Sequence, residues 1–170
     1  PASAAGTTGP IFVGLPLPFD ATVTGVAGDI LDLNVNVTVT ADLTDQITLQ
    51  LTSPGGTTVT LTSGVGTGQF GVGFVNTVFD DDAINTLASG SEPYTGNFQP
   101  TGDLTSFVGE DPNGTWSLIA TTTGFFAFDN LDAWSLEFEL GTIDDSDGDG
   151  WVNCPTWGDC DDTDASIYPD

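Results

Sequence analysis

The chain has 170 residues, 25 of them Asp or Glu and none Lys, Arg or His, so its formal charge at pH 7 is −25. Nucleic acids and anionic lipid surfaces are excluded as partners, because binding to either depends on Lys and Arg. Salt bridges between side chains are excluded as well. Self-repulsion of this size opposes a compact state, and bound cations would relieve it. The alternative interpretation, for the body of the chain, is a solubilising acidic surface.

Length and composition predict one domain with a small appendage, because 38% hydrophobic residues are enough for one modest core. No apolar run is long enough to cross a membrane, so we expect no membrane insertion. The chain starts with Pro1 and contains no Met. We therefore expect a processed or excised form that lies outside the cell or on its surface after removal of a signal peptide.

Residues 1–10, PASAAGTTGP, are small and turn-rich and predict an N-terminal arm rather than an element of secondary structure. The segment 31–40, LDLNVNVTVT, alternates strictly between apolar and polar residues, which is typical of a half-buried strand. Its expected inward row is Leu31, Leu33, Val35, Val37 and Val39.

Further strands are expected on both sides of a turn at SPGG, residues 53–56. They are the segments 46–52, 57–63, 70–79, 115–122 and 131–140. No stretch has a helical period, so residues 11–140 predict an all-β, jelly-roll-like β-sandwich. The composition changes near Gly141, and residues 141–170 are expected to form a short, irregular acidic tail.

Four blocks of this region resemble the proprotein convertase P domain, also called the homo B domain. They are DLTDQITLQLTSPGGTTVTL at 42–61, VFDDDA at 78–83, PYTGNFQPTGDLTSFVGEDPNGTWSL at 93–118 and LDAWSLEF at 131–138. The resemblance covers roughly residues 11–140. It implies a jelly-roll sandwich that is attached to subtilisin-like proteases and to other secreted bacterial proteins, stabilises the catalytic domain and has no active site. The His that often precedes DL in this family is absent from TVTADL at 38–43.

The resemblance also implies roles for single residues. Trp116 and Trp134 are expected to pack in the core, and Asn113-Gly114 to form the tight turn before the strand TWSL. Some family members bind calcium at loops of the sandwich. A candidate second metal site is therefore Asp80, Asp81 and Asp82, with a solvated acidic loop as the alternative.

The tail contains the first half of an EF-hand loop in DSDGDG, residues 145–150. Alternate carboxylates in such a loop surround one hard cation, and the Gly allows a sharp turn. Thr156 occupies the twelfth position, where a bidentate Glu is expected, so later carboxylates must close the site or build a second one. The candidate ligands are Asp145, Asp147, Asp149, the Trp151 carbonyl, Asn153, Asp159, Asp161, Asp162 and Asp164.

The whole tail resembles the DxDGDG…DCDDxDxxIYPG metal-binding repeats of bacterial surface proteins and, in style, thrombospondin type 3 repeats. Some relatives of the former are linked to copper through His, which is absent here, and all-oxygen ligation favours Ca²⁺. Cys154 and Cys160 are expected to form a small disulfide worth roughly 2–2.5 kcal/mol, which fits an extracellular setting. Two thiolates alone make an incomplete zinc site. The alternative for the whole segment is a disordered acidic tail.

Two glycosylation sequons occur, Asn36-Val-Thr and Asn113-Gly-Thr. Asn36 is expected on the outward face of its strand, where it could carry a glycan. Asn113 belongs to the turn of the family motif, so a structural role is expected there.

Catalysis is not expected, because the chain has no His or Lys that could act as the base for a nucleophile. No pair of carboxylates stands out by its spacing either. The first hypothesis is a secreted calcium-binding subunit of an extracellular filament or surface assembly, self-associating as a homopolymer with calcium between subunits. In this hypothesis, the N-terminal arm lies along an edge strand of a neighbouring subunit. The second is an accessory P domain, for stability or substrate adhesion, with a protease catalytic domain as partner. The third is a carbohydrate-binding module that uses Phe125, Phe126 and Phe128.

Overall fold

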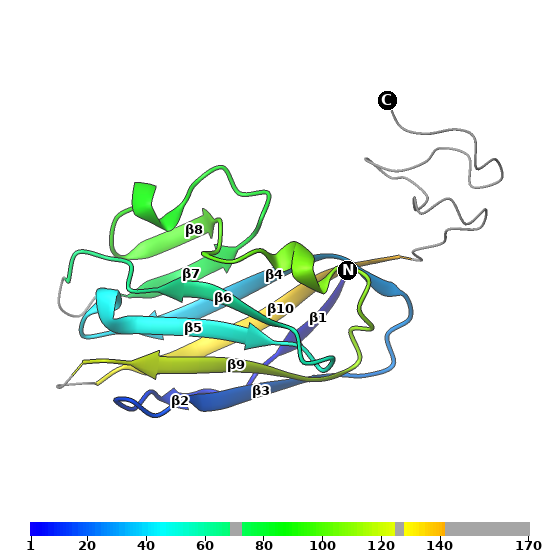
Figure 1. Cartoon of the computed structure of the whole chain (residues 1–170), viewed down its shortest axis with the longest axis horizontal. Coiled ribbons are helices and arrows are strands. Elements are labelled where there is room, and N and C mark those ends of the chain that lie inside the picture. Colours follow the sequence, from blue (N-terminus) through cyan, green and yellow to red (C-terminus); the bar gives the residue numbers. More distant parts are fainter. Residues whose placement is uncertain (69–72, 125–127, 142–170) are drawn as a thin grey trace.

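The computed structural model describes residues 1–68, 73–124 and 128–141, which form two β-sheets packed face to face (Figure 1). The six-stranded sheet has the order β1-β10-β4-β7-β8, with β2 also pairing with β10, and the four-stranded sheet has the order β3-β9-β5-β6. The strands are β1 (Ala2–Ala5), β2 (Gly9–Pro10), β3 (Leu17–Val23), β4 (Asp29–Thr40), β5 (Ile47–Thr52), β6 (Thr58–Ser63), β7 (Phe74–Phe79), β8 (Tyr94–Phe98), β9 (Gly114–Thr122) and β10 (Asn130–Gly141). Three short 3₁₀ turns complete the described elements: η1 (Thr44–Gln46), η2 (Leu87–Ser89) and η3 (Leu104–Phe107). The expected all-β sandwich is confirmed.

The long antiparallel pair β4–β10 forms the centre of the six-stranded sheet, with Val37 opposite Trp134 and Leu33 opposite Phe138. Alternation along both strands turns their apolar residues inward, as expected. The predicted row of inward residues is wrong at its first residue, Leu31. A β-bulge shifts the register so that Leu140 lies opposite Ile30, and Ile30 is buried in place of Leu31.

The predicted hairpin 46–63 is confirmed as β5 and β6 around the SPGG turn. The amide of Gly56 donates to the carbonyl of Ser53 at 3.0 Å, and Gly56 has φ of +93°, which favours glycine. The inward residues of β5 are Ile47, Leu49 and Leu51, all fully buried.

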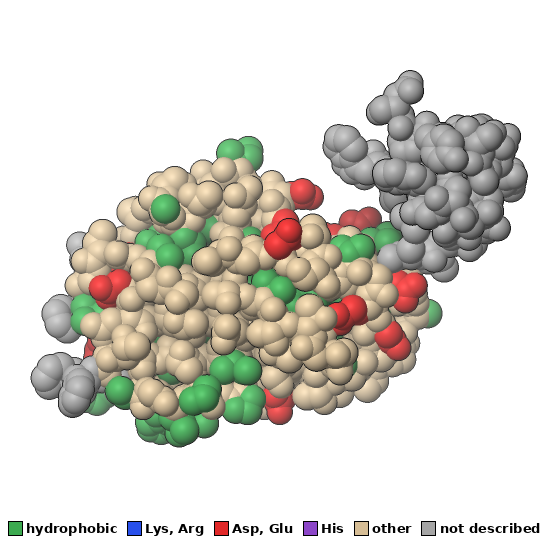
Figure 2. All heavy atoms as spheres, viewed as in Figure 1, with side chains coloured by type: hydrophobic (Ala, Val, Ile, Leu, Met, Phe, Trp, Pro, Cys, Tyr) green, Lys and Arg blue, Asp and Glu red, His purple; other side chains and the backbone are tan. Residues whose placement is uncertain are grey.

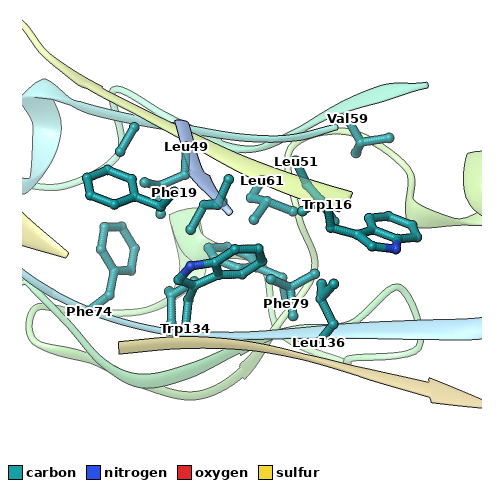
Figure 3. Close-up of a cluster of buried hydrophobic side chains, with 14 of the residues drawn as sticks. Phe19, Leu49, Leu51, Val59, Leu61, Phe74, Phe79, Trp116, Trp134 and Leu136 are labelled. Carbon is teal, nitrogen blue, oxygen red and sulfur yellow. The ribbon is translucent and has the colours of Figure 1, made fainter. Parts of the chain in front are cut away.

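The core lies between the two sheets and is rich in aromatic rings (Figure 3). Trp116 on β9 packs against Phe107 and Phe138, with ring centroids 5.2 and 5.5 Å apart. Nearby, Phe74 stacks on Tyr94 at 5.4 Å. Edge and tilted ring contacts of this kind join η3 and strands of both sheets into one core.

The N-terminal segment is an edge strand, which corrects the expectation of an arm. β1 pairs antiparallel with β10 from Ala2–Phe138 to Ala5–Ser135. Gly6 then crosses Trp134: its amide donates to the Trp134 carbonyl at 3.1 Å, and any side chain at Gly6 would overlap the indole ring. The indole Nε1 donates to the carbonyl of Thr7 at 3.0 Å. The segment expected to reach a neighbouring molecule thus lies on its own sheet.

The strand directions give the sandwich two different ends. β4 begins and β7 and β10 finish at one end, which we call the acidic end because carboxylates gather there. Those carboxylates are Asp29, Asp32, Asp80, Asp81, Asp82, Asp103, Glu110, Asp111, Glu137 and Glu139. β10 begins at the other end, beside the turn of residues 11–16. Figure 2 shows most of the visible acidic side chains on the right, over the end where Figure 1 places the N-terminus and the last residues of β10.

Candidate functional site

The principal metal site expected from the sequence lies outside the described residues. This holds for its candidate ligands and for the two cysteines: Asp145, Asp147, Asp149, Trp151, Asn153, Asp159, Asp161, Asp162, Asp164, Cys154 and Cys160. The disulfide and the calcium site therefore stay predictions. The described strand that precedes them, β10, ends at Gly141 at the acidic end.

The loop after β7 holds the three aspartates of the candidate second metal site. Asp80 Oδ1 accepts the amide of Asp82 at 2.8 Å, and Asp81 Oδ2 accepts the amide of Thr105 at 2.8 Å. The Asp82 side chain is exposed. In the part of the chain that the structure describes, no three Cys, His, Asp or Glu side chains gather closely enough to hold a metal ion. A metal at this loop therefore stays a prediction.

Asp81 and Asp103 form a hydrogen-bonded carboxyl pair beside this loop. The pKa of Asp81 is raised to about 6, mainly by burial; the hydrogen bond and the charge of Asp103 also raise it, and the hydrogen bond from the Thr105 amide opposes the shift. The pKa of Asp103 is lowered by hydrogen bonds from the Thr105 hydroxyl and amide, and then by Asp81. Asp81 is therefore protonated below about pH 6, next to the ionised carboxylate of Asp103.

A pocket of about 420 Å³ opens beside this carboxyl pair. Its lining is Asp81, Asp82, Gln99, Pro100, Gly102, Asp103 and Thr105. Among these groups, the carboxyl of Asp81 can hold a proton. The lining offers no imidazole, amine or thiol, so it lacks the base that activates a nucleophile.

A second pocket, of about 440 Å³, lies on the outer face of the six-stranded sheet at the same end. It is lined by Pro1, Asp32, Asn34, Glu137, Phe138, Glu139 and Leu140. Burial raises the pKa of Asp32, and the charges of Asp80, Asp82 and Glu139 act in the same direction. Asn34 Nδ2 donates to Asp32 Oδ2 at 3.1 Å. Like charges are therefore crowded on this face without a cationic side chain among them.

Comparison with known families decides the assignment. The model of the proprotein convertase P-domain matches residues 30–138, which is more than half of the chain. The chain belongs to the proprotein convertase P-domain family. A P domain is a non-catalytic accessory domain of proteases, so the expectation that this chain is not an enzyme is confirmed. β1, β2 and β3 precede the matched range yet belong to the same sandwich.

Two crystal structures resemble this P domain at 15% sequence identity. One is the serine protease of Aeromonas sobria, with a TM-score of 0.49 over 80% of this chain and 27% of that chain. The other is the same protease in complex with the chaperone ORF2, with a TM-score of 0.48 over 80% of this chain and 26% of that chain. This P domain thus spans about a quarter of the length of those chains. No curated protein matched.

The aromatic and turn residues of the family motif have structural roles in this P domain. Trp116 is fully buried, and its Nε1 donates to the carbonyl of Pro112 at 2.9 Å. Trp134 is also buried, at the edge of the core. The expectation that both tryptophans pack in the core is confirmed.

Asn113 fastens the loop before β4. Its Oδ1 accepts the amide of Val26 at 3.0 Å, and its Nδ2 donates to the Val26 carbonyl at 2.7 Å. Both polar atoms of the amide group are therefore engaged, as the expected structural role requires. Asn36 lies half-buried on β4 between Ser135 and Val78, and its glycosylation stays a prediction.

An exposed hydrophobic group lies at the end opposite the acidic end; of its members, only Phe128 was expected from the sequence to be exposed, and Phe12, Val13 and Leu15 were not. We call this group the apolar tip and define it by Phe12, Val13, Leu15 and Phe128. Phe125 and Phe126, proposed with Phe128 as a sugar-binding platform, lie outside the described residues. The signal was present in IFVGLPLPF at 11–19, where apolar residues occupy consecutive positions and no single face can bury them all. Within the described residues, no helix is long and apolar enough to cross a bilayer.

Proposed function

We propose that this P domain is the accessory domain of a secreted, subtilisin-like protease and stabilises its catalytic domain. The observation that carries the proposal is the family match over residues 30–138. The residue inventory supports it, because a chain without His or Lys cannot supply the base of a Ser-His-Asp or Ser-Lys arrangement. A domain that binds only the folded form of its neighbour stabilises that form by mass action.

The filament hypothesis has less support from the fold. Strand addition between molecules needs open sheet edges, and several edges here are already occupied. The amides of Thr101 and Gly102 donate to the carbonyls of Leu61 and Thr60 at the β6 edge, at 2.9 and 2.7 Å. At the β3 edge, the amide of Thr7 donates to the carbonyl of Asp20 at 2.9 Å. A sandwich with covered edges suits an accessory domain better than a polymer of strands.

We also propose that residues 145–164 bind Ca²⁺. Support comes from the Asp spacing of DSDGDG and from the charge of −25 without a cationic side chain. The position of Gly141 adds to it, because a chain that leaves the sandwich at the acidic end brings more carboxylates to a region already crowded with them. Calcium there would lower the repulsion between tail and sandwich.

The coding sequence on both sides of this segment tests the main proposal. We expect it to encode a subtilisin-like catalytic domain in the same reading frame. Removal of residues 1–141 from the purified full-length protein should then speed thermal inactivation of its peptidase activity several-fold. A reading frame without a protease domain would overturn the proposal.

A further inference from the structure

We propose that the apolar tip is a weak adhesion surface for exposed apolar side chains of a protein substrate. The inference rests on the proposed function, since it assumes that the domain serves a protease. It assigns to the tip a contact with substrate rather than with the catalytic domain.

Backbone hydrogen bonds fix the turn that presents the tip. The amide of Leu15 donates to the carbonyl of Phe12 at 3.3 Å and closes the turn. The amide of Gly14 donates to the carbonyl of Thr122 at 3.0 Å, which ties the turn to β9. The hydrophobic side chains take no part in these bonds and remain free for contact.

Phe128 is held next to this turn by two inward-facing carboxylates. Its amide donates to Asp42 Oδ2 at 3.1 Å, and the amide of Asp42 donates to Asp129 Oδ1 at 2.8 Å. The carbonyl of Asp129 accepts the amide of Ile11 at 2.9 Å, so Phe128 lies beside the 11–15 turn. The charges nearest the tip are thereby engaged with backbone amides, and Asp129 is buried.

The exposed area of the tip is substantial for a monomer. An aromatic side chain has a surface of about 150–250 Å², so the four partly exposed side chains of the tip together present roughly 400 Å² to solvent. Their exposed fractions are Phe12 51%, Val13 46%, Leu15 51% and Phe128 84%. Figure 2 shows hydrophobic atoms gathered at the lower left, where Figure 1 places β2 and the start of β3. This is the usual size of the largest apolar patch on a monomer, and such patches are often functional.

The charge distribution fits an uncharged partner at the tip. β10 alone has 12 residues, and at about 3.3 Å per residue it separates the two ends by roughly 40 Å. The Debye length at physiological ionic strength is about 8 Å, so carboxylates at the acidic end are screened at the tip. At the tip itself, the carboxylates of Asp42 and Asp129 accept backbone amides, so the exposed groups that a partner meets there are the four apolar side chains.

Area and connectivity argue against the two nearest alternatives. A stable dimer buries about 800 Å² on each partner, roughly twice what the tip offers, so a second copy of the chain would bind only weakly. Pro1 and Gly141 both lie at the acidic end, because Ala2 pairs with Phe138 and Asp29 with Gly141. A catalytic domain joined directly before Pro1 would start about one sandwich length from the tip. The tip lies at the end opposite this junction, where it is accessible to a protein substrate.

Lipid is a poorer occupant than protein. Insertion of a small apolar surface into a bilayer is normally assisted by Lys or Arg attraction to anionic lipid, and this chain has neither residue. A protein substrate with many exposed aliphatic side chains presents repeated contacts, so weak single contacts add up through multivalency.

Co-sedimentation of the 170-residue chain with insoluble elastin particles, an apolar protein with few charges, tests the inference. We expect binding at 0.15 M NaCl that persists or strengthens at 1 M NaCl. The double substitution Phe12→Ser with Phe128→Ser should reduce the bound fraction at least tenfold. The matched control is Ile84→Ser, since Ile84 is 96% exposed in the loop after β7, at the acidic end, and its loss should leave binding unchanged. Circular dichroism of both variants reports whether they fold like the parent chain.

Several outcomes would overturn the inference. They are an absence of binding to elastin, binding that the double substitution leaves intact, binding that 1 M NaCl abolishes, and stronger binding to phosphatidylcholine vesicles than to elastin. A stable dimer of the parent chain in sedimentation equilibrium, lost in the double variant, would assign the tip to a second copy instead. These results are independent of the coding-sequence test: a flanking protease domain with no elastin binding refutes the inference alone, and the lack of that domain refutes the proposed function.

Discussion

The two ends of this sandwich are built differently. At the acidic end, carboxylate and amide side chains bind backbone amides, as Asp81 does with Thr105 and Asn113 with Val26. At the apolar tip, backbone hydrogen bonds close the 11–15 turn and the carboxylates of Asp42 and Asp129 accept backbone amides as well, but the apolar side chains stay exposed. A chain without Lys, Arg or His cannot neutralise carboxylates with salt bridges, so side chain to backbone hydrogen bonds fix its loops instead. The two ends therefore differ in what gathers on their surfaces: carboxylates at the acidic end and apolar side chains at the tip.

The largest effect should come from the core beneath the acidic end. Trp116→Ala removes the ring that packs on Phe107 and Phe138 and is expected to lower the free energy of unfolding by about 3–5 kcal/mol. Urea denaturation measures it. Phe128→Ala at the tip should change stability by less than about 0.5 kcal/mol, because that side chain is exposed. Similar losses in the free energy of unfolding for Trp116→Ala and Phe128→Ala would show that the two ends do not differ in their contribution to stability.

Removal of the Asn113 amide should have the next largest effect. Asn113→Ala leaves the amide and carbonyl of Val26 without their partners, which is expected to cost about 1–3 kcal/mol in the free energy of unfolding. Asn97→Ala is the control, because Asn97 is exposed and donates only one long hydrogen bond, of 3.4 Å, to Asp80. Equal denaturation midpoints for the two variants would refute this role of Asn113.

Calcium should stabilise the chain through the tail. At a free concentration ten times Kd, one site contributes about 1.4 kcal/mol, and extracellular modules have Kd of roughly 10⁻⁴–10⁻³ M. We expect a higher melting temperature in 10 mM CaCl₂ than in EDTA, and no difference after Asp145→Asn with Asp149→Asn. A calcium effect that survives this double substitution would place the ion elsewhere, with the loop of Asp80, Asp81 and Asp82 as the next candidate.

The smallest effect, of opposite sign, concerns Asp81. Its pKa in the folded state is raised to about 6 from the ordinary value for Asp, 3.8. The stability that its protonation contributes is therefore complete below about pH 4 and is lost as the pH rises through 6. Asp81→Asn keeps a donor for Asp103 and an acceptor for Thr105, so it should raise the free energy of unfolding at pH 7.5 by at most about 1 kcal/mol, after allowance for solvent screening. At pH 4 the variant and the parent should agree.

Asp82→Asn is the control for that measurement, since it removes one charge from the adjacent, exposed position. Urea midpoints at both pH values distinguish the two variants. An equal gain at pH 7.5 from both would mean that general repulsion at the acidic end, and not the carboxyl pair, sets the pH dependence.

The strands with a clear period of two could be predicted from the sequence, because burial on one face leaves a direct record in the alternation of residues. The hairpin of β5 and β6 and the inward face of β10 are examples. Leu31 was misplaced because a β-bulge depends on the partner strand. β1 was missed because Ala and Ser carry almost no hydrophobic signal, and its pairing comes entirely from the edge of β10.

The candidate sites were predicted less completely. The pairing of Asp81 with Asp103 joins positions 22 apart in the sequence and depends on how the loop after β7 meets η3. Phe12, Val13 and Leu15 of the apolar tip were missed because an apolar residue in a sequence is taken first as a core residue. Only the fold shows that Phe12 faces solvent while Ile11 beside it is buried. The metal ligands of the tail, by contrast, follow a local spacing that a sequence displays by itself.

The crossing of Gly6 over Trp134 has a consequence for the way this protein could misassemble. β1 contributes only four residues to the sheet, yet it shields the edge of β10, the longest strand together with β4. A side chain at Gly6 could not fit against the indole and would lift this strand away. The uncovered backbone of β10 would then be a template for the same segment of another molecule, and strand-exchanged oligomers would follow. Gly6 thus protects the edge of β10 against strand exchange.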